Sequence, residues 1–165
     1  MACGDDAHSS REAPLLARDG SQPDQGAPDA GSARRAIYPI DFEQTYLEMR
    51  DCRHSHEHEL RYIRVFASPS AQKSYGALSA SEPYPVGAQI VKIEYDDSEC
   101  AQPVGFTAME KLSVGANPDG SDWFWQSVDA DGQVRSEGAP PRCVQCHEHH
   151  CEPPFGYDLT CAEEL

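Results

Sequence analysis

Four strand-like segments with β-branched and aromatic residues, and a short fifth after the Asp131-Gly132 turn, follow one another through the middle of this chain. This arrangement constrains the fold most, because short connections between neighbouring strands favour antiparallel pairing. Asn117-Pro118-Asp119-Gly120 is the strongest turn signal between them. The predicted strands cover residues 60–67, 88–95, 104–114 and 123–128, with a short fifth strand around Val134.

Two helices are predicted near the start of this pattern. The first opens at Asp41, a capping residue. Its core-facing stripe is Phe42, Tyr46 and Met49, which recur at helical spacing. The second begins at Ser68-Pro69, an N-cap residue followed by proline at the first helical position. Together these elements predict an α+β domain with a mainly antiparallel sheet and two or three helices.

Residues 1–36 differ in composition from the rest of the chain. They contain no Phe, Tyr or Trp, so they cannot bury enough apolar surface to offset the entropy of ordering. We expect a disordered tether here and a folded domain at residues 37–165. Ala2-Cys3-Gly4-Asp5-Asp6 is similar to the mature end of a bacterial lipoprotein, which predicts a lipid on Cys3 as the link to a membrane. The alternative is an ordinary frayed terminus.

The charge balance of the chain is strongly acidic. Among 165 residues, 28 are Asp or Glu and 13 are Lys or Arg, which gives a formal net charge of −15. Nucleic acids and anionic membrane surfaces both require a cationic face, so neither is an expected partner. An acidic surface instead favours a basic redox partner protein.

The most specific motif lies near the C-terminus. Cys143-Val144-Gln145-Cys146-His147 is a C-x-x-C-H sequence, the attachment motif of c-type haem. Two thiols three positions apart can each add to one vinyl group of a porphyrin, and His147 is then held under the iron as the proximal ligand. The motif therefore predicts one covalently bound haem c on Cys143, Cys146 and His147.

Three other chemistries share parts of this motif. A thioredoxin-like dithiol also uses C-x-x-C, but in a βαβ context that the preceding Pro140-Pro141 and the strand pattern argue against. A disulfide between the two motif cysteines is a second alternative. A zinc site is the third, and its available ligands are Cys143, Cys146, His147, His149, His150 and Cys151. A haem-free domain that holds zinc or disulfides therefore stands beside the haem interpretation.

The order of motifs along the chain resembles the cytochrome P-460 family and its relative, cytochrome c′-beta. The resemblance covers about residues 38–161. It rests on Tyr84-Pro85-Val86-Gly87-Ala88, Gln89-Ile90-Val91-Lys92, Met109-Glu110-Lys111, Asp122-Trp123-Phe124-Trp125 and the C-x-x-C-H motif. It implies a β-rich domain in which one sheet covers one face of a single haem. It also implies residence in the periplasm or cell envelope, and such proteins are often homodimers.

The resemblance implies two kinds of activity. Members of the P-460 branch oxidise hydroxylamine, alone or with nitric oxide, at a five-coordinate haem. Members of the c′-beta branch bind nitric oxide and other small gases behind an apolar distal cap, without catalysis. Electron transfer is a third role open to a monohaem c-type cytochrome. The expected small ligand is thus hydroxylamine or a nitrogen oxide, and whether the chain is an oxidoreductase depends on other residues.

A lysine bonded to the haem rim marks the P-460 branch, and Lys92 is the candidate by position. On the strand predicted at residues 88–95, Lys92 shares a face with the apolar Ala88 and Ile90, so it would point inward. An inward lysine is costly unless it is paired or covalently consumed. The alternative is an ion pair between Lys92 and Glu94 at a solvated edge.

The resemblance also implies further pocket residues. Arg64 is the candidate distal arginine, and an exposed strand position is its alternative. Glu94 and Glu110 are both available as a carboxylate that moves protons, and Glu110 joins Lys92 and Arg64 as a candidate catalytic residue. Met109 would be a sixth iron ligand only in an electron-transfer cytochrome. The aromatic candidates for packing on the porphyrin are Phe66, Phe106, Trp123 and Trp125.

Four further cysteines lie outside the motif. Cys151 and Cys161 are predicted to close a turn, and Cys52 and Cys100 would form a second bridge, although four cysteines allow three pairings. With two thiols on haem and Cys3 on lipid, all seven cysteines are assigned.

One histidine-rich stretch also stands outside the motif. His54, His56 and His58 alternate, so an extended chain would place the three imidazoles on one face, a transition-metal geometry. A solvated loop is the alternative.

Overall fold

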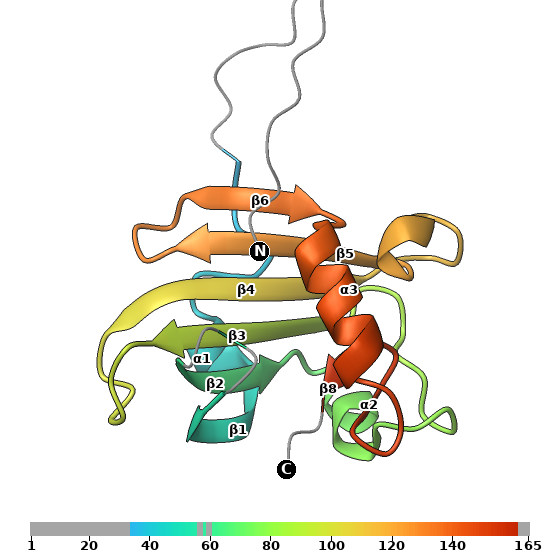
Figure 1. Ribbon diagram of the computed structural model, residues 1–165, viewed down its shortest axis with the longest axis horizontal. Coiled ribbons are helices and arrows are strands. Elements are labelled where there is room, and N and C mark those ends of the chain that lie inside the picture. The colour runs from blue at the N-terminus through green and yellow to red at the C-terminus, as the bar shows by residue number, and fades with distance from the viewer. Residues whose placement is uncertain (1–33, 56–57, 59–60, 162–165) are drawn as a thin grey trace, which may run out of the picture. The chain divides into compact units, whose positions relative to one another are not determined.

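The computed structural model describes residues 34–55, 58 and 61–161, and its centre is a six-stranded antiparallel sheet (Figure 1). Each strand pairs with the next along the chain, in the order β1-β2-β3-β4-β5-β6. The strands are β1 Leu47–His54, β2 Tyr62–Ala67, β3 Gln89–Tyr95, β4 Pro103–Lys111, β5 Trp123–Asp129 and β6 Val134–Gly138. The five predicted strands correspond to β2 through β6.

Helices and a short hairpin complete the described part of the chain. They are α1 Phe42–Thr45, α2 Gln72–Ala77, the 3-10 turn Pro118–Gly120, α3 Pro141–His150, and the hairpin of β7 Gly156–Tyr157 with β8 Thr160–Cys161. These elements confirm the α+β class with a mainly antiparallel sheet. The predicted lipid attachment at Cys3 and residues 1–33 of the predicted tether lie outside the described residues.

None of the described helices is both long and apolar enough to cross a membrane.

Both faces of the sheet are covered. In Figure 1, α3 crosses the front of the sheet and α1 lies behind it. Because side chains alternate along a strand, β3 sends Ile90 toward α3 and sends Val91 and Ile93 to the opposite side. We call these the α3 face and the α1 face. The α3-face core contains Ile63, Val65, Ile90, Met109, Trp123 and Trp125. The α1-face core contains Phe42, Phe66, Val91, Ile93, Tyr95 and Ala108.

The first predicted helix is only one turn long. It ends at Thr45, and Tyr46 already has extended backbone with φ −98° and ψ 155°. The chain then forms the edge strand β1, so Met49 lies on a strand and not on a helical stripe. Asp41 makes no side-chain capping bond. Five of the eight β1 residues have partners in β2, and this tertiary pairing overrides the local helical spacing.

The second helix begins later than predicted, at Gln72. Ser68 does not cap it, since the Ser68 hydroxyl accepts the backbone N–H of Gln89 at 2.9 Å. The Ser68 carbonyl instead accepts the N–H groups of Ala71 and Gln72, which forms the turn between β2 and α2.

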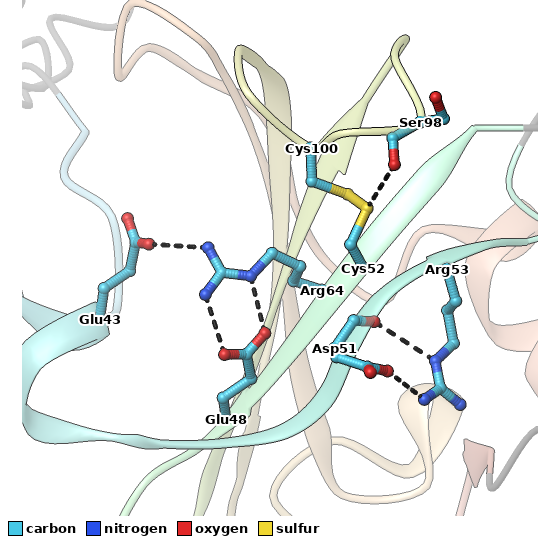
Figure 2. Close-up of polar contacts among 8 residues, drawn as sticks. All are labelled: Glu43, Glu48, Asp51, Cys52, Arg53, Arg64, Ser98 and Cys100. Atoms are coloured by element: carbon cyan, nitrogen blue, oxygen red, sulfur yellow. Dashed lines mark hydrogen bonds and ion pairs between the residues drawn. A yellow bond between two sulfur atoms is a disulfide. The ribbon is translucent and has the colours of Figure 1, made fainter.

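Four cysteines form two disulfides, and the pairing is the one the sequence analysis favoured. Cys52–Cys100 joins β1 to the connection between β3 and β4, with the Cα atoms 5.9 Å apart (Figure 2). Cys151–Cys161 closes the segment between α3 and β8, with the Cα atoms 4.4 Å apart. The motif residues Cys143 and Cys146 are free thiols and do not pair with each other.

Candidate functional site

A cavity of about 430 Å³ lies on the α3 face, between the sheet and α3. Its volume falls within the range of small-molecule and cofactor sites. The apolar part of its lining is Ile63, Val65, Tyr75, Ile90, Met109 and Trp125. The charged part is Arg50, Arg53, Lys92, Glu94 and Arg142. Four cations and one carboxylate make this wall basic, although the whole chain carries a net charge of −15.

Cys143, Cys146 and His147 all line the cavity from α3. Residues three and four positions apart lie on one side of a helix, so the C-x-x-C-H spacing brings them together. Pro141 occupies the first helical position and Val144 anchors the helix in the α3-face core. Burial raises the pKa of the Cys143 thiol, which is therefore protonated at neutral pH. The sequence analysis did not predict α3, although Pro141 is a helix-start signal.

The His147 ring is held by Leu159 and Trp125. Its Nδ1 donates a hydrogen bond to the carbonyl oxygen of Leu159 at 2.7 Å. One edge packs against Trp125, with the ring centroids 4.8 Å apart. Burial lowers the pKa of His147 to about 4, so the imidazole is neutral at physiological pH. With Nδ1 as the donor, Nε2 carries the lone pair of the neutral ring.

The Leu159 carbonyl is itself fixed by the turn of the β7–β8 hairpin. Asp158 and Leu159 both have left-handed backbone, with φ 50° and 62°. The indole Nε1 of Trp123 donates to the Asp158 carbonyl at 2.9 Å, and Lys111 Nζ contacts the Asp158 carboxylate at 2.8 Å. Tyr84 bonds to the Thr160 hydroxyl at 2.8 Å. The acceptor that orients His147 is therefore anchored to the sheet.

Lys92 points into the cavity, and it also forms the ion pair that was weighed as the alternative. Its Nζ lies 3.3 Å from Glu94 Oε1, and the two side chains are 12% and 17% exposed. Arg61 Nη1 holds the other Glu94 oxygen at 3.2 Å. Burial lowers the pKa of Lys92, while the Glu94 carboxylate opposes that shift. The pair is thus part of the cavity wall and not a solvated edge.

The structure removes Arg64 from the candidate site. Arg64 lies on the α1 face, because its strand neighbours Ile63 and Val65 point to the cavity. Its guanidinium binds Glu48 through two bonds of 2.7 and 2.9 Å and reaches Glu43 at 3.4 Å (Figure 2). Arg64 is therefore a strand residue outside the cavity, paired with Glu48, and does not reach the position expected of a distal arginine.

Glu110 is removed for the same reason. It follows Met109, which lines the cavity, and so points to the α1 face, where it accepts a hydrogen bond from Gln89 Nε2 at 2.6 Å. Of the two carboxylates considered for proton transfer, Glu94 is the one in the cavity wall.

The aromatic candidates separate between the two faces. Trp125 lines the cavity. Trp123 is on the same face but is fully buried against Tyr84, with the ring centroids 5.0 Å apart. Phe66 and Phe106 belong to the α1-face core and do not reach the cavity.

Two of the three alternating histidines are described, and they have different surroundings. His54 lies at the end of β1 and packs against Tyr62, with the ring centroids 5.3 Å apart. His56 lies outside the described residues. His58 lines the cavity. In residues 34–55, 58 and 61–161, no group of three His, Cys, Asp or Glu side chains is close enough to hold a metal ion.

Arg50 is a cavity residue that the sequence analysis missed. Its guanidinium lies over the Tyr75 ring, 5.4 Å from the centroid, and Nη1 donates to the Met49 carbonyl at 3.2 Å. Its Nε is buried and has no hydrogen-bond partner among the residues that the structure describes. A buried unpaired donor in a cavity wall indicates a missing acceptor.

The chain matches no protein-family model and no curated protein. Its function is therefore argued from the site itself.

Proposed function

We propose that this chain is a monohaem c-type cytochrome, with the haem in the cavity under α3. Cys143 and Cys146 hold it through thioether bonds, and His147 is an axial ligand of its iron. One observation carries this proposal: all other described cysteines are paired, whereas the two C-x-x-C-H thiols are free and adjoin a neutral imidazole at one cavity wall.

The chemistry of the cavity wall fits haem. Haem combines a flat apolar macrocycle with two propionate carboxylates. The apolar strand residues, with Trp125, suit the macrocycle, and the cationic group of Arg50, Arg53 and Arg142 suits the carboxylates. The buried unpaired Nε of Arg50 is a donor that a propionate would satisfy. Zinc would use neither the apolar wall nor this donor.

The residues of α3 and the hairpin define how the group is held. Each thiol adds across one vinyl double bond, with sulfur bonding to carbon and the thiol hydrogen moving to the neighbouring carbon, so no atom leaves. His147 presents Nε2 because Nδ1 donates to Leu159, and that bond also raises the basicity of the ring. When bound, haem supplies a reversible one-electron change at iron and a coordination position for a small ligand.

A second candidate function is oxidation of hydroxylamine or a related nitrogen species. The observation that favours it is Lys92, a lysine nearly buried in the cavity wall beside Glu94. A bond from Lys92 Nζ to a haem edge carbon would replace one N–H and one C–H, which requires a two-electron oxidant such as a peroxide. Glu94, in place of Glu110, would then move protons near the ligand.

Two features support an exported protein. The disulfides Cys52–Cys100 and Cys151–Cys161 are typical of oxidising compartments. A periplasmic or cell-envelope location, with a lipid on Cys3 and a basic redox partner, remains part of the proposal.

Expression with a c-type haem maturation system tests the function. Wild-type protein should retain haem stain on a denaturing gel, and Cys143→Ala/Cys146→Ala should lose it. The matched control, Cys52→Ser/Cys100→Ser, also removes two cysteines but should keep the stain. A soluble wild-type protein without stain, with stoichiometric zinc, would favour the haem-free alternative.

A further inference from the structure

A second histidine, His58, lines the cavity beside the motif. It lies in the turn that follows β1, and its ring centroid is 6.1 Å from that of His147, with the ring planes at 69°. Both imidazoles belong to the cavity wall. His58 comes from the sheet side and His147 from α3, so two separate parts of the chain supply this pair.

Each ring is held by a hydrogen bond at its Nδ1 nitrogen. His58 Nδ1 lies 2.7 Å from the Ser55 hydroxyl, as His147 Nδ1 lies 2.7 Å from the Leu159 carbonyl. Ser55 is fully buried, and its backbone N–H donates to the Arg61 carbonyl at 2.8 Å, so the anchor of His58 is fixed. Metal-binding histidines usually engage one ring nitrogen in this way and bind with the other. Nε2 of His147 therefore carries a lone pair for a ligand bond, and Nε2 of His58 does so in the tautomer in which Nδ1 donates to the Ser55 hydroxyl.

The separation of the two rings agrees with a shared metal ion. Two imidazoles on opposite sides of one metal ion are separated by two metal–nitrogen bonds of about 2 Å each plus the two ring radii.

We propose that His58 is the second axial ligand of the haem iron, opposite His147. This inference rests on the proposed function, and it departs from the five-coordinate iron that the family resemblance implies. In the resting protein the iron would be six-coordinate and low-spin. Nitric oxide, carbon monoxide or hydroxylamine would reach it only by displacing His58. Ser55 is a positioning residue, since it acts on the iron through the His58 ring.

The cavity contains two rivals for this coordination position. Met109 lines the same wall and has a thioether sulfur, and Lys92 has an amine. His58 differs from both, because the Ser55 hydroxyl holds its ring through Nδ1. The Lys92 amine is instead held by the Glu94 carboxylate. Variants of all three residues therefore belong in one experiment.

The test uses the full chain with haem attached, and reads absorption and electron paramagnetic resonance spectra. Wild-type protein should be low-spin in both oxidation states. His58→Ala should become high-spin and bind carbon monoxide at least about tenfold more tightly, because the internal competitor is gone. Added imidazole should restore the low-spin spectrum of this variant, which shows that its fold and pocket survive. His54→Ala is the matched control and should match wild type.

Each contrary result has a distinct meaning. A wild-type protein with attached haem and a high-spin spectrum overturns the inference and leaves the proposed function standing. A low-spin spectrum that survives His58→Ala but is lost in Met109→Ala or Lys92→Met also overturns it. A wild-type protein without attached haem overturns the proposed function, and this inference with it.

Discussion

His147 donates its Nδ1 hydrogen to the carbonyl of Leu159 across 2.7 Å, and this bond connects the motif helix to the C-terminal hairpin. The disulfide Cys151–Cys161 closes the same segment two residues after Leu159. Orientation of the proposed iron ligand and covalent closure of the hairpin are therefore parts of one local structure.

Breaking the hairpin disulfide should change both stability and the site. In haem-loaded protein, Cys151→Ser/Cys161→Ser should lower the free energy of unfolding by about 3 kcal/mol, from loop-closure entropy. It should also shift the haem absorption bands, because the Leu159 carbonyl loses its restraint. The Cys52–Cys100 disulfide closes a longer loop, so Cys52→Ser/Cys100→Ser should lower the free energy of unfolding by about 4 kcal/mol. The haem spectrum of this variant should not change. Denaturant unfolding and absorption spectra measure both effects, and equal spectral shifts in the two variants would argue against the local link.

Arg50 should set the reduction potential, and Arg64 should not. Arg50→Gln removes a positive charge from the cavity wall, which favours the oxidised haem and lowers the midpoint potential on the order of tens of millivolts. Arg64→Gln breaks the ion pairs with Glu48 and Glu43 on the α1 face, so it should cost about 1 kcal/mol of stability and leave the potential unchanged. Redox titration distinguishes them. A larger shift for Arg64 would contradict the face assignment.

Much of the sheet could be predicted from sequence, because β2 through β5 contain several β-branched and aromatic residues, and Asp131-Gly132 marks the turn before β6. β1 was missed, since this edge strand has no buried position and carries charged residues such as Glu48 and Arg53. The start of β1 also lies next to the one-turn helix α1, and the helical spacing of apolar residues in the sequence continues past Tyr46 to Met49. Only pairing with β2 decides between the two structures.

The site was predicted in part. The spacing of the C-x-x-C-H residues brings them together on any helix, so their grouping followed from sequence. Arg64 and Glu110 were predicted to lie in the pocket, but the structure places both on the α1 face, outside the cavity. Apolar residues such as Ile90 and Val91 cover both faces of the sheet, so both faces look like core in the sequence. Alternation alone then does not tell which face has the cavity. His58 depends on the path of a turn, and local sequence does not encode that path.

The haem-free chain should lose stability in acid. Burial holds the pKa of His147 at about 4 and that of His58 at about 2, below the ordinary 6.5. As the pH falls below about 6.5, the unfolded chain binds protons that the folded chain does not, so stability decreases toward pH 4. Each group adds a slope of about 1.4 kcal/mol per pH unit. Urea unfolding of Cys143→Ser/Cys146→Ser at several pH values measures this slope.

The same series has an internal comparison. Adding His147→Gln and His58→Gln to the Cys143→Ser/Cys146→Ser background removes both titrating groups and should flatten the slope. Equal slopes in the two backgrounds would show that other groups carry the acid sensitivity.

A Lys92–haem bond separates an oxidase from a ligand-binding or electron-transfer cytochrome. If it forms, the mature protein should be two hydrogen masses lighter than the sum of polypeptide and haem, with both disulfides counted. Proteolysis should then leave the Lys92 peptide on the haem together with the Cys143–Cys146 peptide. Lys92→Met should restore the full mass and an ordinary c-type spectrum. An ordinary c-type spectrum in the wild-type protein, together with a Lys92 peptide that is not bound to haem, would contradict the oxidase alternative.

The central claim is that Cys143 and Cys146 hold one haem, and the intact mass of protein from a maturation-competent host tests it most directly. Under denaturing conditions the wild-type mass should equal polypeptide plus one haem, and the mass of Cys143→Ala/Cys146→Ala should equal polypeptide alone. Wild-type polypeptide without haem, either with both motif thiols free or lighter by the two hydrogens of a Cys143–Cys146 disulfide, would contradict it.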